Sequence, residues 1–319
     1  MIVDKIIMTQ TDTITTCLSC GSDKLNQLTT SSAQMHDTDE KFHFVQCESC
    51  NLVMLNPRVK ETELHQYYTD YYLPFRGPSA WGKYAPLVTK NLNKTDKKRV
   101  TISVKAAQLN TNSRVLDVGC GKPTYLKLLQ EKTGAYCKGI DFSNEGWKNE
   151  PEEYSNLDLE VAEFNQFKSE KPFDLITMWH YLEHDYHPIE TLKQMKHVSH
   201  ENTRMLIEVP NYNSWTRRAQ KSHWEGYHTP RHTAIYEPKT IAKLLENAGW
   251  KAECIKPYGT LDPYPLYWMG QQEKKGIDWS QSMESKFIGF VAGMIWTSPI
   301  FMLKKWFPAG IMTIVAKPI

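Results

Sequence analysis

The chain has 319 residues, of which 40% are hydrophobic, and this is enough to bury one large core together with a small accessory module. The formal net charge is only +2 at pH 7. A nearly neutral chain argues against extended contact with nucleic acid, which usually requires a basic stripe. The one dense basic stretch, Lys94–Arg99, is interpreted as the solvated face of a helix.

The N-terminus does not have the pattern of a secretory leader. Within Met1–Gln10 there is only a short apolar run, and Asp4 and Lys5 interrupt it. Together with seven cysteines, this pattern favours a reducing compartment, so we expect a cytoplasmic protein.

Two Cys-x-x-Cys pairs lie near the start of the chain, at Cys17, Cys20, Cys47 and Cys50. Four thiolates at this spacing suit a tetrahedral zinc ion. Gly21 and Asn51 follow the two pairs, and both residue types tolerate the left-handed backbone that such knuckles often need. We therefore predict a zinc-ribbon-like module over residues 1–56, with a structural zinc, because four thiolates leave no open coordination position. A redox dithiol pair and disulfides are the alternatives.

Residues 57–110 are predicted to form a helical linker that contains a tyrosine cluster at Tyr67, Tyr68, Tyr71 and Tyr72. The cluster has two interpretations, an aromatic lid over a ligand and packing between domains. Packing is favoured, because tyrosine often bridges core and solvent.

A buried strand followed by a glycine turn is predicted at Arg114–Gly121. Asp117 closes the strand, and Gly119 and Gly121 let the backbone pass close to a ligand. A helix follows, and the next strand ends at Asp141, where a carboxylate can accept hydrogen bonds from both hydroxyls of a ribose. This order is typical of a nucleoside-binding βαβ unit.

The details of the loop favour one class of such units. A dinucleotide fingerprint requires glycine or alanine as the sixth residue counted from its first glycine, and counting from Gly119 this chain has Thr124 there. The motif instead resembles the first motif of class I S-adenosylmethionine-dependent methyltransferases, with Pro123 in place of the third glycine. The resemblance implies an α/β fold with a seven-stranded Rossmann-like sheet. It also implies that S-adenosyl-L-methionine is the methyl donor.

The resemblance extends over residues 111–259 and 310–319. Phe173–His180 and the loop after it are similar to the fourth strand of methyltransferases of the ubiquinone-biosynthesis O-methyltransferase type, and Arg204–Pro210 is predicted to be the fifth strand. Lys251–Lys256 and Ile311–Ala316 would form the antiparallel pair at the edge of the sheet. We thus expect a methyltransferase domain over residues 111–319 with a hydrophobic insertion at 260–309. The residues expected to bind the cofactor are Asp117, Gly119, Cys120, Gly121, Asp141, Glu163 and Trp179.

The N-terminal arrangement carries a second resemblance. Asn56-Pro57-Arg58 follows the cysteine pairs, as it does in bacterial methyltransferases of envelope-glycan gene clusters and in sugar C-methyltransferases. This resemblance implies a sugar, glycan or lipid-linked small-molecule acceptor, and hence a role in polysaccharide biosynthesis.

Histidines are concentrated after the fourth and fifth strands, at the sheet edge where open α/β folds bind ligands. A neutral histidine can remove the proton from an acceptor hydroxyl near neutral pH. His232, in a Pro-Arg-His triplet that matches the family, is the first candidate for this role, and His184 is the second. The alternatives are structural roles for both residues and a metal site that also uses Glu183, Asp185 or Glu225.

Phe287–Leu303 is a run of seventeen residues without a charge, flanked by lysines and containing Trp296. Its length is at the lower limit for a membrane span. A single crossing would, however, leave Ile311–Ala316 on the wrong side of the bilayer to join the sheet. One interpretation is a segment that lies peripherally in the membrane interface at the inner face. The other is a hydrophobic hairpin that covers the domain or forms a dimer contact.

Taken together, these patterns predict an S-adenosylmethionine-dependent methyltransferase that O-methylates its acceptor with histidine assistance. Two rivals remain: an RNA methyltransferase whose zinc module binds RNA, and a non-catalytic protein that retains the fold. The sequence alone does not separate them.

Overall fold

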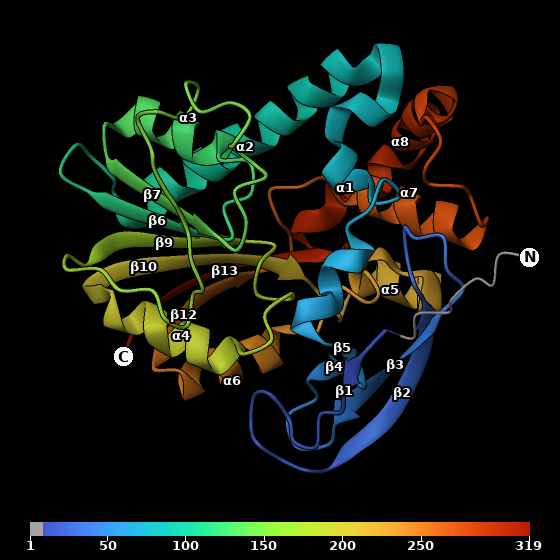
Figure 1. The fold of residues 1–319 in the computed structure, drawn as a ribbon, viewed down its shortest axis with the longest axis horizontal. Coiled ribbons are helices and arrows are strands. Elements are labelled where there is room, and N and C mark those ends of the chain that lie inside the picture. The colour runs from blue at the N-terminus through green and yellow to red at the C-terminus, as the bar shows by residue number, and fades with distance from the viewer. Residues whose placement is uncertain (1–8) are drawn as a thin grey trace, which may run out of the picture.

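The computed structural model describes residues 9–319, so most of the apolar run within Met1–Gln10 lies outside the described residues. Its centre is a seven-stranded sheet with the order β12-β13-β10-β9-β6-β7-β8 (Figure 1). The five parallel strands are β6 (Arg114–Val118), β7 (Tyr136–Asp141), β8 (Asp158–Val161), β9 (Phe173–Trp179) and β10 (Ser199–Pro210). The seven-stranded sheet predicted from the sequence is confirmed.

The edge of this sheet is antiparallel, as expected. β13 (Ile311–Pro318) pairs with β10 on one side and with β12 (Trp250–Lys256) on the other. β13 therefore lies inside the sheet although it is the last strand of the chain. Its apolar residues are almost fully buried, which explains why the strand is mostly hydrophobic on both faces.

Helices cover both faces of the sheet (Figure 1). α2 (Ala85–Ala107) and α3 (Thr124–Thr133) lie on one face, and α4 (Pro188–His197) and α6 (Pro238–Asn247) lie on the other. α6 begins at a proline in its first turn and buries Ile241, Leu244 and Leu245, so its apolar residues recur at helical spacing. Its chain reverses at Gly249, where φ is +83°.

The N-terminal part forms a second, smaller sheet from β2 (Leu25–Ser32), β3 (Lys41–Cys47), β4 (Val53–Leu55) and β11 (Ala234–Ile235). β11 comes from the other end of the chain and pairs with β4. A two-stranded ribbon, β1 (Thr11–Asp12) with β5 (Arg58–Val59), lies next to it in the chain. The cysteine-bearing module is thus joined by strand pairing to the part of the chain that carries the large sheet, and the predicted domain limits stay predictions.

The linker is helical. It contains η1 (Glu61–Tyr67), α1 (Leu73–Arg76) and η2 (Gly77–Tyr84) before α2. The basic stretch in α2 is only partly a solvated face, because Arg99 is half-buried against Asp96. After β10 come α5 (Trp215–Gln220), η3 (Lys221–His223) and η4 (Glu225–Tyr227). The insertion before β13 holds α7 (Pro263–Lys274), η5 (Glu284–Lys286), α8 (Phe287–Met302) and η6 (Leu303–Lys305).

Candidate functional site

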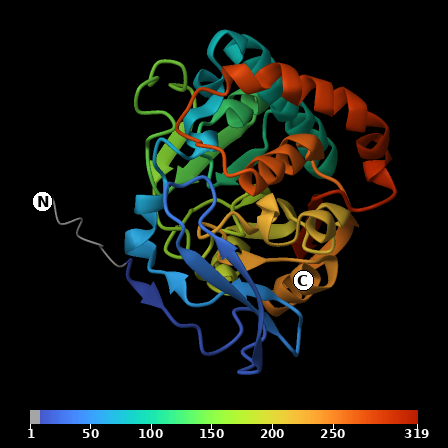
Figure 2. The same ribbon diagram turned by 90° about the vertical axis from the view of Figure 1, so that its right-hand side faces the viewer.

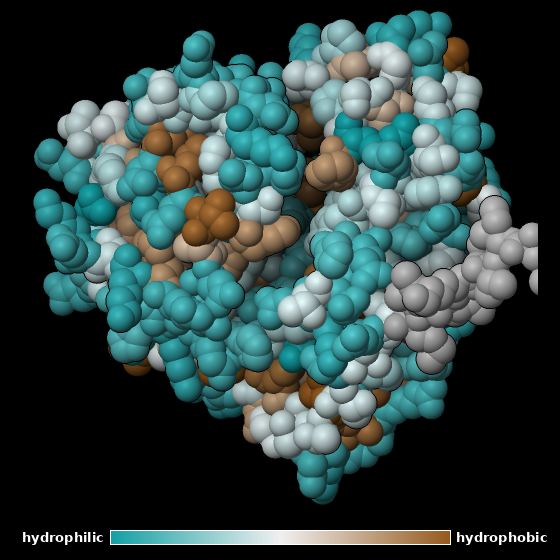
Figure 3. All heavy atoms as spheres, viewed as in Figure 1, coloured by the Kyte–Doolittle hydropathy of each residue, from teal (hydrophilic) through white to brown (hydrophobic). Residues whose placement is uncertain are grey.

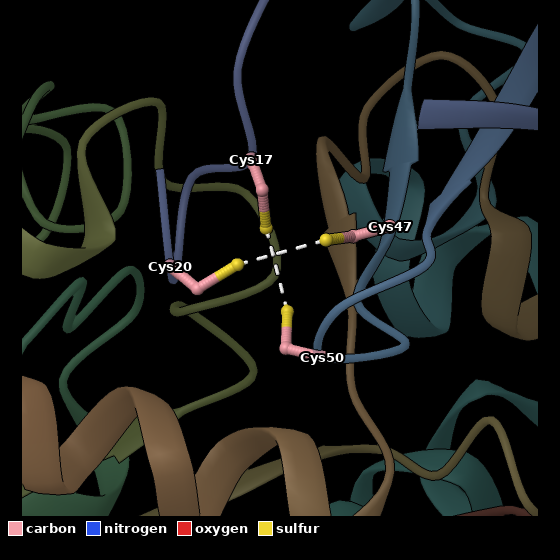
Figure 4. Close-up of side chains that lie close together, drawn as sticks. All are labelled: Cys17, Cys20, Cys47 and Cys50. Atoms are coloured by element: carbon pink, nitrogen blue, oxygen red, sulfur yellow. Dashed lines mark hydrogen bonds between the residues drawn. The ribbon is translucent and has the colours of Figure 1, made fainter. Parts of the chain in front are cut away.

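The four predicted metal ligands converge on one point (Figure 4). The Sγ atoms of Cys17 and Cys50 are 3.5 Å apart, and those of Cys20 and Cys47 are 3.6 Å apart. These separations exclude disulfides, in which sulfur atoms are about 2 Å apart. They are close to the roughly 3.8 Å edge of a tetrahedron of thiolates around zinc at about 2.3 Å. The donor set therefore fits a structural zinc ion, and each cysteine would supply one ligand.

The backbone after each cysteine pair has the conformation that the sequence predicts. Gly21 has φ +72° and Asn51 has φ +64°, and their amides donate to the carbonyls of Cys17 and Cys47 at 2.9 Å. Nearby, the Asn247 side chain of α6 donates to the carbonyl of Ser19. The module is thus also hydrogen-bonded to the large-sheet domain beside the cysteine cluster.

The glycine loop follows β6 directly. Gly119 has φ +69° and Gly121 has φ +49°, values that favour glycine at both positions. The amide of Gly121 donates to Oδ2 of Asp141 at 2.9 Å, so the end of β7 holds the loop in place. Asp117 lies beneath the loop and accepts from the Thr177 hydroxyl at 2.6 Å, and burial raises its pKa to about 7.

The other predicted cofactor residues lie around this loop with different exposures. The sulfur of Cys120 packs in the core against Gly139, so only the backbone of this residue is available to a cofactor. Trp179 is buried at the end of β9, and its Nε1 has no partner among the described residues. Glu163 is exposed beyond β8 and accepts from Gln166. Their roles in cofactor binding stay predictions.

The loop fits the adenosyl cofactor that the sequence predicts. Its two positive-φ glycines expose backbone, and the buried Nε1 of Trp179 is a donor without a partner among the described residues. Ribose binding by Asp141 stays a prediction. Above the loop, Tyr181 lies so close that a Cβ on Gly119 would be 2.6 Å from its ring. The space-filling view shows a hollow between the lobe of α2 and α3 and the rest of the molecule, with apolar side chains inside it (Figure 3).

Three histidines, from the loop after β9 and the segment after η4, gather together. The rings of His184 and His232 are 4.5 Å apart, and those of His228 and His232 are 4.8 Å apart. Nδ1 of His184 contacts the carbonyl of Arg231, and Nδ1 of His232 contacts the carbonyl of Gly226. Because a carbonyl only accepts, both Nδ1 atoms carry a proton, which leaves Nε2 with a free lone pair. The structure therefore brings together the two predicted catalytic residues, whose roles stay predictions.

Electrostatics keeps these histidines neutral. Burial lowers the pKa of His184 to about 4, and it lowers the pKa of His232 well below its usual value. Glu183 lies with them, since its carboxylate and the two rings offer ligand atoms that all lie within 4.8 Å of one another. Oε2 of Glu183 is buried and makes no hydrogen bond within the described residues. These three side chains could hold a divalent cation.

A second polar cluster lies next to the first and was not predicted. His180, at φ +57°, contacts Oε1 of Glu183 at 3.3 Å and Oε1 of Glu208 at 3.1 Å. Glu208 also accepts from the amide and hydroxyl of Thr260. Burial opposes protonation of His180, but the two carboxylates raise its pKa to about 9. Glu183 is three residues from His180, but Glu208 is 28 residues away, and no local signal would reveal that second pairing.

Arg231 was also missed as a structural residue. Its buried guanidinium donates to the backbone carbonyls of Gln34, Met35 and Tyr67, and it lies 4.3 Å from the ring centre of Tyr72. The Pro-Arg-His triplet thus connects the histidine loop to both the small sheet and the linker. Tyr72 in turn packs against His228, so the tyrosine cluster both packs between domains and borders the histidines.

The chain resembles solved structures only distantly. A search of curated proteins found no match. Among solved structures, the Burkholderia thailandensis 1,6-didemethyltoxoflavin-N1-methyltransferase is 11% identical, covering 84% of this chain and 95% of that chain with a TM-score of 0.47. A putative sarcosine dimethylglycine methyltransferase from Galdieria sulphuraria is 10% identical, covering 73% and 87% with a TM-score of 0.48. Likenesses this distant carry no information on the substrate.

The family comparison is decisive. A family model described as a methyltransferase domain matches residues 91–255, just over half of the chain. The matched range contains the glycine loop, Asp141 and the parallel strands of the sheet. The chain therefore belongs to this methyltransferase domain family and is an S-adenosylmethionine-dependent methyltransferase.

Proposed function

We propose that this enzyme transfers a methyl group from S-adenosylmethionine to a hydroxyl oxygen of a sugar, glycan or lipid-linked acceptor. The observation that carries the proposal is the pair of neutral histidines, His184 and His232. The His184 amide donates to the carbonyl of Tyr181, whose ring lies against Gly119 of the loop that would hold the methyl donor. The cofactor, when bound, supplies the electrophilic methyl group. The chain supplies the loop that positions it and a site that restricts water.

The histidines are suited to handling the acceptor's proton. A hydroxyl becomes a strong nucleophile only as it loses its proton, and a free Nε2 lone pair can accept it. The carbonyls of Arg231 and Gly226 fix the tautomer that leaves Nε2 free. Tyr72 and Tyr181 border the same space and offer aromatic faces, which suit a sugar ring.

The acceptor class rests on the sequence resemblance at Asn56-Pro57-Arg58, whose structural role is visible. Asn56 exchanges two hydrogen bonds with the backbone of Ile14, and Arg58 donates to the carbonyl of Tyr186. The motif therefore joins the cysteine module to the loop after β9, which carries Glu183 and His184. This coupling supports an acceptor site to which the module contributes.

A specific observation also favours a metal-assisted version of the same reaction. In both histidines Nδ1 hydrogen-bonds to a backbone carbonyl, an arrangement common among metal-binding histidines. Oε2 of Glu183 is buried and has no hydrogen-bond partner among the described residues. A divalent cation held by these residues would make the acceptor hydroxyl more acidic. Assays with and without added Mg²⁺ or Mn²⁺ distinguish the two versions, because a histidine base needs neither ion.

The acceptor can be found by comparing glycans and lipids, by mass spectrometry, from cells with and without the gene. We expect one species to lose a single methyl group in the deletion strain and to regain it when the wild-type gene is restored. A strain that carries His232→Asn should stay undermethylated. If the missing methyl group is instead found in RNA, the acceptor proposed here is wrong and the RNA methyltransferase is supported.

A further inference from the structure

α8 is a helix with two apolar faces. Its inner face packs on aromatic rings of the domain: Phe287 stacks on Tyr84 at a centroid distance of 4.0 Å, and Phe290 lies 5.3 Å from Trp268. Gly293 has no room for a side chain, since a Cβ there would be 2.2 Å from the hydroxyl of Tyr264. These contacts fix the helix on the body of the protein and decide which side faces outward.

The outer face of α8 is apolar and exposed. Ile288 is 72% exposed, Ile295 66%, Trp296 86% and Met302 74%, and their spacing places them along one side of the helix. Trp306, just beyond the helix, is 77% exposed. Soluble proteins seldom expose a continuous stripe of large apolar side chains without a partner. A stripe of this kind is typical of a surface that binds a membrane or another protein.

The charges around this stripe are mostly positive. Lys286 lies at its start and Lys304 and Lys305 at its end, and from Ser285 to Ile319 the sequence contains no aspartate or glutamate. Glu284, just before α8, is paired with Lys83, and Lys304 donates to the carbonyl of Leu261. Lysine and tryptophan beside an apolar helix face are the residues that anchor helices at a lipid interface. Because the flanking charge is positive on balance, it complements anionic headgroups.

The fold also determines how such a helix could meet a membrane. Among the described residues, Glu284–Lys305 is the one helical stretch long and apolar enough to span a bilayer. Both of its ends are nevertheless held on the same body: Met283 donates to the carbonyl of Ala80, and the chain enters β13 soon after η6. Figure 2 shows α8 lying along the outside of the molecule. A helix in this position can rest in the interface, but it cannot cross the bilayer.

We propose that the outer face of α8 docks the enzyme on an anionic bilayer surface, with Ile295 and Trp296 inserted at the headgroup boundary. The insertion that carries α8 also carries Thr260, which bonds Glu208 in the polar cluster beside the histidines. Docking through α8 would therefore hold the active-site edge of the sheet near the membrane. This inference concerns the location of the enzyme and does not depend on the identity of the acceptor.

Flotation of the purified protein with vesicles tests the proposal. Wild type should float with vesicles that contain phosphatidylglycerol and bind about tenfold less to pure phosphatidylcholine, with added salt weakening the interaction. The double variant Ile295→Lys/Trp296→Lys should lose vesicle binding by about tenfold or more, since each lysine opposes burial. The milder variant Trp296→Ser should show a smaller loss in the same direction.

A matched control places the same two charges elsewhere: Leu28→Lys/Ile319→Lys changes two exposed apolar residues outside α8 and should float like wild type. Thermal melting and S-adenosylhomocysteine binding of all variants show that the fold and the cofactor site are intact. The proposal is overturned if wild type does not float, or if the control loses binding as much as the α8 variant. It is also overturned if wild type is a dimer that the α8 variant dissociates while vesicle binding is unaffected.

Discussion

Nε2 of His180 lies 3.1 Å from Oε1 of Glu208, and together they form a buried ion pair next to the predicted catalytic histidines. The carboxylates of Glu183 and Glu208 raise the pKa of His180 to about 9 against the opposing effect of burial. Although burial opposes ionisation of Glu208 too, His180 lowers its pKa to about 2. The pair therefore couples the stability of the site to pH.

The first prediction follows from the signs of these shifts. A histidine with a raised folded-state pKa contributes stability below its unfolded value of 6.5, and this contribution is lost as the pH rises toward 9. Glu208, whose folded-state pKa is lowered, stabilises the fold at pH values above its usual pKa of 4.5, and this stabilisation is lost as the pH falls toward 2. His180→Gln should lower the free energy of unfolding by about 3 kcal/mol near pH 6. The difference from wild type should shrink by pH 9.5.

Urea unfolding at several pH values measures this difference. His200→Gln is a matched control, because His200 lies at the same 3.1 Å from Asp174 but in a more exposed pair. It should cost at most about 1 kcal/mol. A pH-independent difference for His180→Gln would show that the ion pair does not form in solution.

A second prediction concerns the end of β7. Asp141→Ala removes the carboxylate that accepts from the Gly121 amide and that would bind the ribose, so affinity for S-adenosylhomocysteine should fall by about 1.5–3 kcal/mol. Isothermal titration calorimetry gives this value directly. Asp158→Ala, an acidic residue on the neighbouring β8, should bind like wild type. Unchanged affinity in Asp141→Ala would remove this residue from the cofactor site.

The cysteine cluster yields a third prediction. Elemental analysis of protein purified without chelator should find about one zinc per chain, and Cys17→Ser should lose most of it. Because β4 pairs with β11, we expect loss of the metal to loosen the small sheet while the large sheet persists. Cys254→Ser, outside the cluster, should retain its zinc. Zinc-free wild-type protein would contradict the assignment.

The features predicted correctly from sequence depend on local spacing. The glycine loop and the two cysteine pairs were predicted from residues close together in the chain, where turn geometry and periodicity act, and the seven-stranded sheet from the family resemblance that these local motifs carry. The small sheet's pairing with β11 and the three carbonyl contacts of Arg231 were not predicted, because they join residues up to 197 positions apart. Arg99 was misinterpreted for the same reason, since its contact with Thr260 on a distant loop is visible only in the fold.

The histidine pair gives the last prediction. Since burial lowers the pKa of His184 to about 4 and keeps His232 neutral as well, the base is already deprotonated at pH 6, and kcat should stay nearly constant between pH 6 and 8. His232→Asn should lower kcat by about 10²–10⁴-fold while cofactor affinity is retained. His43→Asn, an exposed histidine on β3, serves as the control. The pH dependence of kcat is measured with the identified acceptor as substrate. If kcat falls on the acid side with a midpoint near pH 6.5, and this fall is absent in His232→Asn, the base is a histidine with an ordinary pKa and the buried neutral base is wrong.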